Sequence, residues 1–388
     1  MKLIEENETK TFNNIDDFQA AIDFRTANDR IMIARIRDLQ IAKRRSDESA
    51  ADFKARVHAS MPEDVIEEHK GLFLDFNTEI NGVMRHAVLP LREIALDSLY
   101  ERAKVTCFTI TNEDSTDGNL VMDPFKKIDF INDAFKLYGG NAQILFRDQK
   151  ITSVMSSQYY HITMNSLNNA ILALKEDFPQ MQFKDAVLSH EFFRETYLLN
   201  SDELEEDILL SLKDAGIDAE DVSVEVTGHT CDYGKIAATF SGVINIDGKK
   251  LLFGSPESVK HAGKKTEDDV KKKAIKLYSS FKDNAEKIKH LPEVHIDHPD
   301  GCFRLIAKEF HLPKKISCEL AKALEGRIDV TAYEIYWMLN RVVFAAEEKG
   351  MDMLRIIILQ EMVAKTLNAS YKSFDREFLW NRGEYAED

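Results

Sequence analysis

Apolar residues in the middle of the chain alternate with polar ones, which is the pattern of strands with one buried face. Residues 222–227 carry valine at every second position, and residues 236–246 continue the alternation. The dipeptide Asp247-Gly248 separates this run from residues 249–253, and such a dipeptide is typical of a tight β-hairpin. These segments predict an antiparallel sheet that packs one face on the core.

A second hairpin is expected within residues 142–162, where residues suited to a pleated, half-buried surface dominate. A tight polar turn at Asp148 and Gln149 would join its two strands. Residues 104–112 and 186–199 are also predicted as strands. Because most strand candidates follow the hairpin in sequence, we place it at the start of the sheet.

Helical spacing of apolar residues marks both ends of the chain. Residues 13–104 are expected to be mostly helical, because apolar residues such as Ile15, Phe18 and Ile22 recur every three or four positions. Near the other end, Thr331 and Glu334 have the spacing of a helix-capping box ahead of a long apolar stripe. Further helices are expected at residues 166–177, 201–215, 264–290 and 353–367.

These patterns predict an α+β fold with a mainly antiparallel sheet core, flanked by N-terminal and C-terminal helical regions. The chain has 388 residues, which exceeds the size at which one core usually keeps growing. We therefore expect an N-terminal helical region at 1–104, an α+β core at 105–290, and a linker with a C-terminal helical region at 291–388.

The charge and the cysteines narrow the classes of function. A formal net charge of −16 opposes general adhesion to nucleic acid or to an anionic membrane, although it allows a local basic surface. No apolar run approaches the roughly 20 residues of a membrane span, and the acidic N-terminus does not resemble a signal peptide. The four cysteines are widely spaced, which favours reduced thiols and a cytoplasmic protein.

Two basic zones stand out in this acidic chain. Residues 25–45 hold seven basic residues against two acidic ones, and residues 249–290 hold twelve lysines, six acidic residues and no arginine. Each zone is either a phosphate-binding face or a solvated helix face balanced by acidic neighbours. Lysine acts as a point charge, so the second zone would suit contact with phosphates better than reading of bases.

No catalytic motif is found: the phosphate-binding loop, the dinucleotide fingerprint and the nucleophile elbow are all missing. The sequence thus favours a protein that is not an enzyme, and it indicates no cofactor and no catalytic residue. Two loops hold imidazole, thiol and carboxylate groups, which are zinc ligands, without the paired spacing of a zinc motif. The metal candidates in these loops are His229, Cys231, His295 and His298, with Asp232, Asp297, Asp300 and Cys302 as their neighbours.

Residues 147–159 read Arg-Asp-Gln-Lys-Ile-Thr-Ser-Val-Met-Ser-Ser-Gln-Tyr and precede a predicted helix. This segment resembles phage/plasmid-like proteins that carry a widespread bacterial domain of unknown function, as does the turn Lys260-His261-Ala-Gly263. The resemblance spans about residues 120–367. It implies a mobile genetic element in a bacterial cytoplasm and supplies no established activity. The family's arginine and Cys-Asn pair ahead of the His turn are replaced here by Phe-Gly-Ser-Pro-Glu-Ser.

The leading hypothesis is a non-enzymatic protein of phage or plasmid DNA metabolism that binds single-stranded DNA. The alternatives are a protein-interaction or virion-associated structural protein without nucleic-acid contact, and a metal-dependent enzyme. Protein partners or self-association fit the second reading, and no membrane partner is expected. The candidate contacts to nucleic acid are Arg147, Lys150, Tyr159, Tyr160, Lys260, Lys264, Lys265, Lys271, Lys272 and Lys273.

Overall fold

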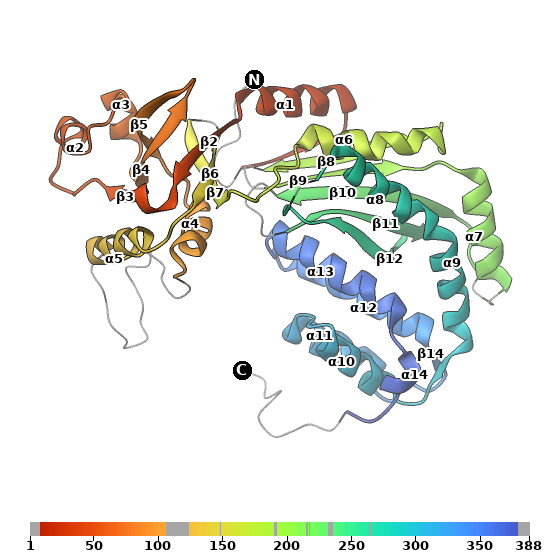
Figure 1. The fold of residues 1–388 in the computed structure, drawn as a ribbon. Helices are drawn as coiled ribbons and strands as arrows, with labels where there is room; N and C mark the ends of the chain where they lie inside the picture. The colour runs from red at the N-terminus through yellow and green to blue at the C-terminus, as the bar shows by residue number, and fades with distance from the viewer. Residues whose placement is uncertain are drawn as a thin grey trace.

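The chain forms two lobes, of which the smaller is inserted between the first helix and the rest of the larger (Figure 1). This computed structural model describes residues 8–105, 124–147, 149–189, 192–214, 216, 218–231, 236–263 and 265–378. The larger lobe contains both the N-terminal strand and the C-terminal helices.

The smaller lobe contains two three-stranded antiparallel sheets. One has the order β2-β6-β7, with β2 at Arg30–Arg35, β6 at Asn141–Arg147 and β7 at Lys150–Ser156. The other has the order β3-β4-β5, with β3 at Gln40–Lys43, β4 at Leu72–Ile80 and β5 at Val83–Pro90. The helices of this lobe are α2 Ala50–Arg56, α3 Glu63–Glu68, α4 Ala95–Ala103 and α5 Pro124–Lys136. A shared apolar cluster, which includes Leu74, Leu99, Ile131 and Ile144, joins both sheets to α4 and α5.

The larger lobe is organised around a six-stranded antiparallel sheet of order β1-β8-β9-β10-β11-β12. Its strands are β1 Thr9–Phe12, β8 Gln182–Ser189, β9 Phe192–Leu198, β10 Val222–Cys231, β11 Ala238–Ile246 and β12 Lys249–Val259. The first strand lies at one edge, where Phe12 is paired with Ala186. Asp247 and Gly248 both have positive φ, as the tight turn between β11 and β12 requires.

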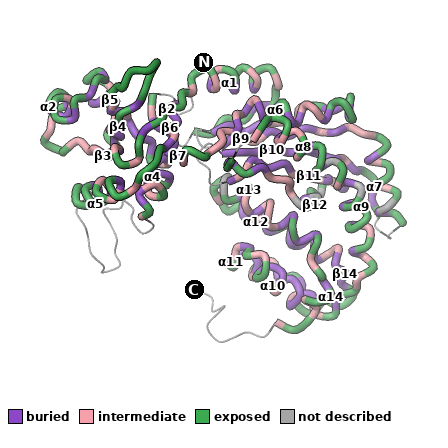
Figure 2. Tube along the Cα trace, in the orientation of Figure 1, coloured by how far each residue is buried: buried purple, intermediate pink, exposed green. Residues whose placement is uncertain are grey.

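Helices cover both faces of this sheet and leave a continuous buried layer between them (Figures 1 and 2). On one face lie α1 Ile15–Asn28, α6 Met164–Leu172, α7 Asp202–Asp214, α8 Glu267–Ser279 and α9 Phe281–His290. On the other lie α12 Ala332–Glu348 and α13 Met353–Lys365. Helix α6 approaches so closely that a Cβ atom on Gly228 would lie 2.4 Å from Cδ1 of Ile171.

The remaining C-terminal elements pack below α12. They are α10 Pro299–Glu309, α11 Lys314–Ala321 and α14 Tyr371–Phe374, with a two-stranded pairing of β13 His295–Ile296 and β14 Val330–Thr331. Short 3-10 turns occur at Ile36–Asp38, Ala173–Glu176, Leu291–Glu293, Lys322–Leu324 and Thr366–Asn368. Within the described ranges, no helix has the length and apolar character that crossing a membrane requires.

The predicted α+β class with antiparallel sheets is confirmed. The hairpin around Asp247-Gly248 forms as expected, and so does the hairpin of β6 and β7. The capping box of Thr331 and Glu334 is present at the start of α12. These features depend on local turn and cap chemistry, which the sequence contains in full.

The expectation of a mostly helical segment at residues 13–104 is wrong, because strands β2 to β5 lie there. The dipeptide Asn81-Gly82 has positive φ at both residues and turns β4 into β5. In β2, Ile31 and Ile33 are exposed while Ala34 is buried, so burial alternates with a period of two, as in a strand.

The central hairpin does not open the six-stranded sheet, contrary to expectation. Strand β6 pairs with β2 of the smaller lobe instead, from Arg30↔Phe146 to Arg35↔Asn141. The strand expected at 186–199 is a hairpin of β8 and β9, and the linker expected from 291 already contains the start of α10. Residues 106–112 of the strand expected at 104–112 lie outside the described residues.

Candidate nucleic-acid interface

A cleft of about 310 Å³ lies between the two lobes. Its lining from the smaller lobe includes Arg102 at the end of α4 and Ser156 at the end of β7. From the larger lobe come Tyr159, Lys260 and His261. The cleft therefore combines two cationic side chains with two aromatic rings.

The two aromatic rings stack on each other. The ring centroids of Tyr159 and His261 are 4.9 Å apart and their planes are inclined by 10°. Backbone pairing fixes this arrangement, because Tyr159 forms a bridge with Ala262 and the Tyr160 amide donates to the His261 carbonyl at 3.0 Å. The structure thus joins the end of the 147–159 segment to the turn at 260–263, although about a hundred residues separate them.

The imidazole of His261 has a partner at each nitrogen. Its Nδ1 lies 3.0 Å from the Tyr160 carbonyl oxygen, and its Nε2 lies 3.0 Å from Oγ1 of Thr230. Because a carbonyl oxygen only accepts, Nδ1 donates and the Thr230 hydroxyl can donate to Nε2. The histidine is 8% exposed, so it acts as a fixed platform beneath the partly exposed Tyr159 ring.

The cations of the cleft differ in their freedom. Lys260 is exposed directly beside the stacked rings. Arg102 has a side chain that is 17% exposed and forms an ion pair with Glu101 at 3.1 Å. Its Nε atom is buried and makes no hydrogen bond with the described residues. A phosphate at the cleft would therefore meet exposed Lys260, the paired Arg102 and the Glu101 carboxylate beside it.

Arg147 is not a surface residue, and its assignment as a nucleic-acid contact is wrong. Its side chain is 0% exposed, and Nε donates to Oδ1 of Asp29 at 2.6 Å while Nη2 donates to Oδ2. Lys150 follows at the same end of the hairpin. It is separated from Ser156 by six residues of strand, which is about 20 Å at the usual rise. Lys150 therefore lies far from the tyrosines along the hairpin, and it does not line the cleft.

The lysine-rich helix contributes less than its composition indicates. Lys273 donates to Glu257 at 2.7 Å, and Lys276 pairs with the same carboxylate at 2.5 Å. Lys271 and Lys272 belong to α8, and neither they nor Lys265 lines the cleft. Figure 1 shows α8 lying over the sheet. Lys264 lies outside the described residues.

Two arginines of the first basic zone are held by contacts within the fold. Arg25 is 3% exposed and donates to the carbonyl of Ser189 at 2.5 Å. Arg44 pairs with Glu67 at 2.5 Å. Neither arginine lines the cleft.

The first metal candidate loop is engaged in other contacts. His229 is 2% exposed, and its Nε2 lies 3.3 Å from Oε1 of Glu361 on α13. Burial raises the pKa of the Glu361 carboxyl, but the contacts with His229, together with Thr239 and Lys365, outweigh burial and lower it. Cys231 is buried and its Sγ donates to the carbonyl of Ile236 at 3.5 Å. Asp232 lies outside the described residues.

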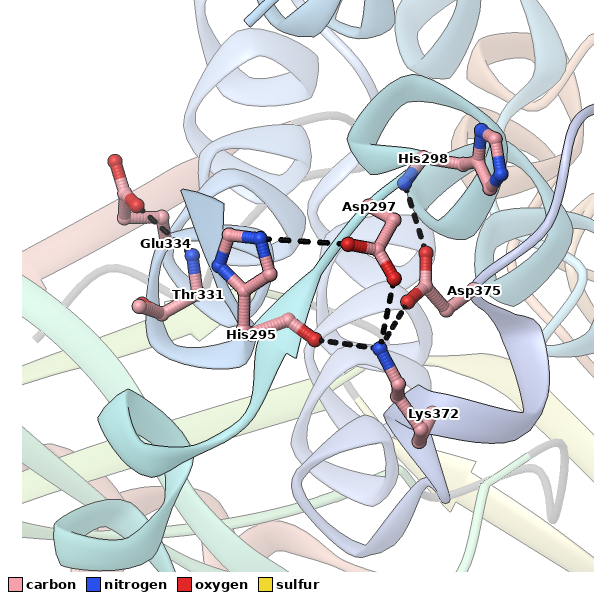
Figure 3. A network of polar contacts seen from close by, with 7 residues as sticks. All are labelled: His295, Asp297, His298, Thr331, Glu334, Lys372 and Asp375. Atoms are coloured by element: carbon pink, nitrogen blue, oxygen red, sulfur yellow. Dashed lines mark hydrogen bonds and ion pairs between the residues drawn. The ribbon is translucent and has the colours of Figure 1, made fainter. Parts of the chain in front are cut away.

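In the second metal candidate loop, the Lys372 ammonium occupies the centre of the polar groups (Figure 3). It donates to the His295 carbonyl at 3.0 Å, to Asp297 at 3.1 Å and to Asp375 at 2.6 Å. The His298 ring points away from this network, and only its backbone amide takes part, at 2.8 Å from Asp375. A metal ion would compete directly with the lysine.

The thiol near this loop is also unsuited to a metal. Burial, with a further contribution from Asp375, raises the pKa of Cys302 to about 12. Across the described ranges, no three histidine, cysteine or acidic side chains are close enough together to hold a metal ion.

No family model, no curated protein and no solved structure matches this chain. The geometry of the cleft is consequently the main source of functional argument. Sequence reasoning selected Tyr159 and Lys260 and missed Arg102, which had no distinguishing neighbour in the sequence. His261 was visible only as part of a short turn motif.

Proposed function

We propose that this chain is a non-enzymatic protein that binds single-stranded DNA in the cleft between its lobes. The observation that carries the proposal is the Tyr159 ring, stacked on buried His261 and flanked by Lys260 and Arg102. Single-strand binders combine aromatic platforms for the bases with cations for the backbone, and both occur here within one hollow.

The two kinds of group would act differently. A base stacks on the Tyr159 ring, and such contacts contribute about 1–3 kcal/mol per base. Lys260 pairs with a backbone phosphate and releases condensed counterions, so its contribution falls as salt increases. Because the whole chain carries a net charge of −16, this attraction is local and binding would be strongest at low salt.

The test is fluorescence anisotropy of a labelled single-stranded oligonucleotide at several salt concentrations. We expect Tyr159→Ala to weaken binding about 5- to 150-fold, the equivalent of one lost stacking contact. Tyr159→Phe keeps the ring and removes the hydroxyl, which lies 3.5 Å from the Cys231 carbonyl oxygen, so it should bind like the parent. Lys260→Ala should reduce the slope of log K against log salt by about 0.7.

A control lysine outside the cleft distinguishes binding in the cleft from general electrostatic attraction to the protein surface. Lys175 is exposed on the turn after α6 and does not line the cleft, so Lys175→Ala should leave the affinity unchanged. Absence of binding at low salt would end the proposal. Equal losses in Lys175→Ala and Lys260→Ala would show that any surface lysine serves, and the cleft would then have no role.

The resemblance noted in the sequence adds a setting to this proposal. It implies a phage or an integrated plasmid in a bacterial cytoplasm, and DNA binding by this chain rests on the cleft alone. Sequencing the genes that neighbour this one would test that setting, because genes of chromosomal metabolism on both sides would contradict it.

A protein-interaction role is the second candidate, and the β4–β5 hairpin favours it. Ile80, Val83 and Met84 at its tip are 44%, 54% and 63% exposed. Clustered apolar side chains on a projecting hairpin are typical of contact surfaces. If this tip mediates self-association, light scattering should give a mass that rises with concentration, and Met84→Lys should abolish the rise. A constant monomer mass would remove this support.

A further inference from the structure

A second hollow, of about 200 Å³, lies on the opposite side of the six-stranded sheet from α6 and α8. The sheet forms its floor, and α12 and α13 form its wall. Its ionisable lining is Asp185, Arg194, Glu225, Lys250 and Glu347. This is an unusual set of charges for the space between a sheet and its covering helices.

Two of the polar groups in this hollow are fully engaged by the protein. Glu225 is 3% exposed and is paired with Lys184 at 2.5 Å and with Lys250 at 3.7 Å. Asn340 accepts from the Leu252 amide at 2.8 Å and donates to the Tyr336 carbonyl at 2.8 Å. These groups shape the hollow and have little capacity left for a ligand.

Three other groups remain open. Arg194 and Asp185 approach each other only to 3.8 Å, and both Nε of Arg194 and Oδ1 of Asp185 are out of contact with solvent without a hydrogen bond to the described residues. Glu347 lies at the exposed mouth and forms no ion pair with any residue that the structure describes. These two atoms have no surface that an occupant could touch, but the Arg194 and Asp185 side chains are 20% and 27% exposed. Their other polar atoms can therefore contact an occupant of the hollow.

The arrangement of open groups selects the kind of occupant. A simple anion could use the Arg194 donors but would meet three carboxylates, and a simple cation would leave those donors unsatisfied. A molecule with one carboxylate and one amine can pair with the Arg194 guanidinium and with the acidic side chains at the same time. Val343 and Phe344 supply an apolar wall for the rest of it.

We propose that this hollow is a binding site for a free α-amino acid. Its carboxylate faces Arg194, a geometry in which guanidinium donors form paired hydrogen bonds. Its ammonium faces Asp185 and Glu347. The volume fits a molecule of this size, since a water takes about 30 Å³ of liquid and the hollow would otherwise hold about seven waters. The site is separate from the cleft and does not depend on DNA binding.

Isothermal titration calorimetry with L-leucine and its two truncated analogues tests the chemistry. The analogue 4-methylpentanoate lacks the amine, and 3-methylbutylamine lacks the carboxylate. We expect saturable binding of L-leucine and at least tenfold weaker binding of each analogue. Glycine, L-glutamate and L-lysine are titrated in the same way, because the charged groups of the hollow select the α-carboxylate and α-amine and do not select one amino-acid side chain.

Variants locate the binding site. Arg194→Gln should abolish the preference for L-leucine over 3-methylbutylamine, which lacks the carboxylate. Glu347→Gln should lower the affinity for L-leucine at least tenfold and leave the affinity for 4-methylpentanoate unchanged. Glu348→Gln alters the next residue of α12, which does not line the hollow, and should bind like the parent. Thermal unfolding of each variant without ligand shows whether it folds.

Three results would overturn the proposal. The first is that none of the four amino acids gives saturable heat, which means that water alone fills the hollow. The second is equal affinity for L-leucine and both analogues. The third is that folded Arg194→Gln and Glu347→Gln bind L-leucine like the parent, which would place the site elsewhere.

Discussion

Replacing Arg147 by methionine should destabilise the smaller lobe strongly. The guanidinium is 0% exposed and donates through Nε and Nη2 to both carboxylate oxygens of Asp29, whose side chain is 11% exposed. Removing one partner of a buried pair leaves the other charge without compensation, which costs about 3–5 kcal/mol. Because Asp29 retains slight access to water, we expect the lower end, about 3 kcal/mol.

Urea unfolding followed by far-UV circular dichroism measures this loss. Arg37→Met is the matched control, since that side chain is 57% exposed and reaches Asp38 only at 3.8 Å. Such surface pairs contribute about 0–1 kcal/mol. Combining Arg147→Met with Asp29→Leu should restore much of the stability, because apolar replacement of a whole buried pair is often neutral.

The same variant separates a structural role from a ligand contact. Arg147→Met should bind an oligonucleotide with the parent's affinity at temperatures where it is folded. A loss of affinity without a loss of stability would refute our placement of this arginine and restore the original hypothesis. An unfolding free energy within about 0.5 kcal/mol of the parent would refute the magnitude derived from the buried pair.

Three further substitutions test other parts of the fold. Gly301→Ala should loosen the C-terminal segment and speed its limited proteolysis, because a Cβ there would lie 2.1 Å from the Arg376 carbonyl oxygen, whereas Gly139→Ala, with nothing within 4 Å, should not. Burial raises the pKa of Glu195 well above its usual value. The unfolding free energy of the parent should therefore fall as the pH rises above about 4.5. The unfolding free energy of Glu195→Gln should not show that fall. Burial raises the pKa of Asp375, but the Lys372 ammonium and backbone amides outweigh burial and lower it. The Asp375 carboxylate should therefore stabilise the fold above about pH 4 and lose this effect in more acidic solution. There, the unfolding free energies of Asp375→Asn and the parent should converge.

Local signals in the sequence predicted several elements of the larger lobe. The Asp247-Gly248 turn and the Thr331 capping box depend on residues within four positions of each other, and both form. The sequence also contains a hairpin-turn dipeptide at Asn81-Gly82. The surrounding apolar residues were nevertheless interpreted as helical, and the β4–β5 hairpin was not predicted. That prediction failed because apolar residues from several strands of mixed exposure can imitate helical spacing over a few turns.

Pairing between distant segments could not be predicted in this way. Strand β1 joins the larger sheet through partners near residue 186, after the whole smaller lobe has been inserted. The cleft depends on the same kind of information, since Arg102 and Lys260 meet only because the two lobes pack together. A basic residue such as Arg147 gives no sign in the sequence that Asp29 buries its charge, so net charge along a segment overstates the cationic surface.

The two chain connections between the lobes are each fixed by contacts described above, and this bears on the proposed cleft. Asp29 ends the first connection and is held by Arg147 of the smaller lobe. The second connection carries Tyr159 and Tyr160, which are held by the His261 turn of the larger lobe. The residues that would bind a base therefore also set the spacing of the lobes. Tyr159→Phe keeps the ring on His261, so it is the control for Tyr159→Ala. A difference in affinity between the two variants can come from the lost ring contact with the oligonucleotide or from a change in lobe spacing. Hydrogen exchange of the Tyr160 amide, which should speed up only if the spacing changes, distinguishes these causes.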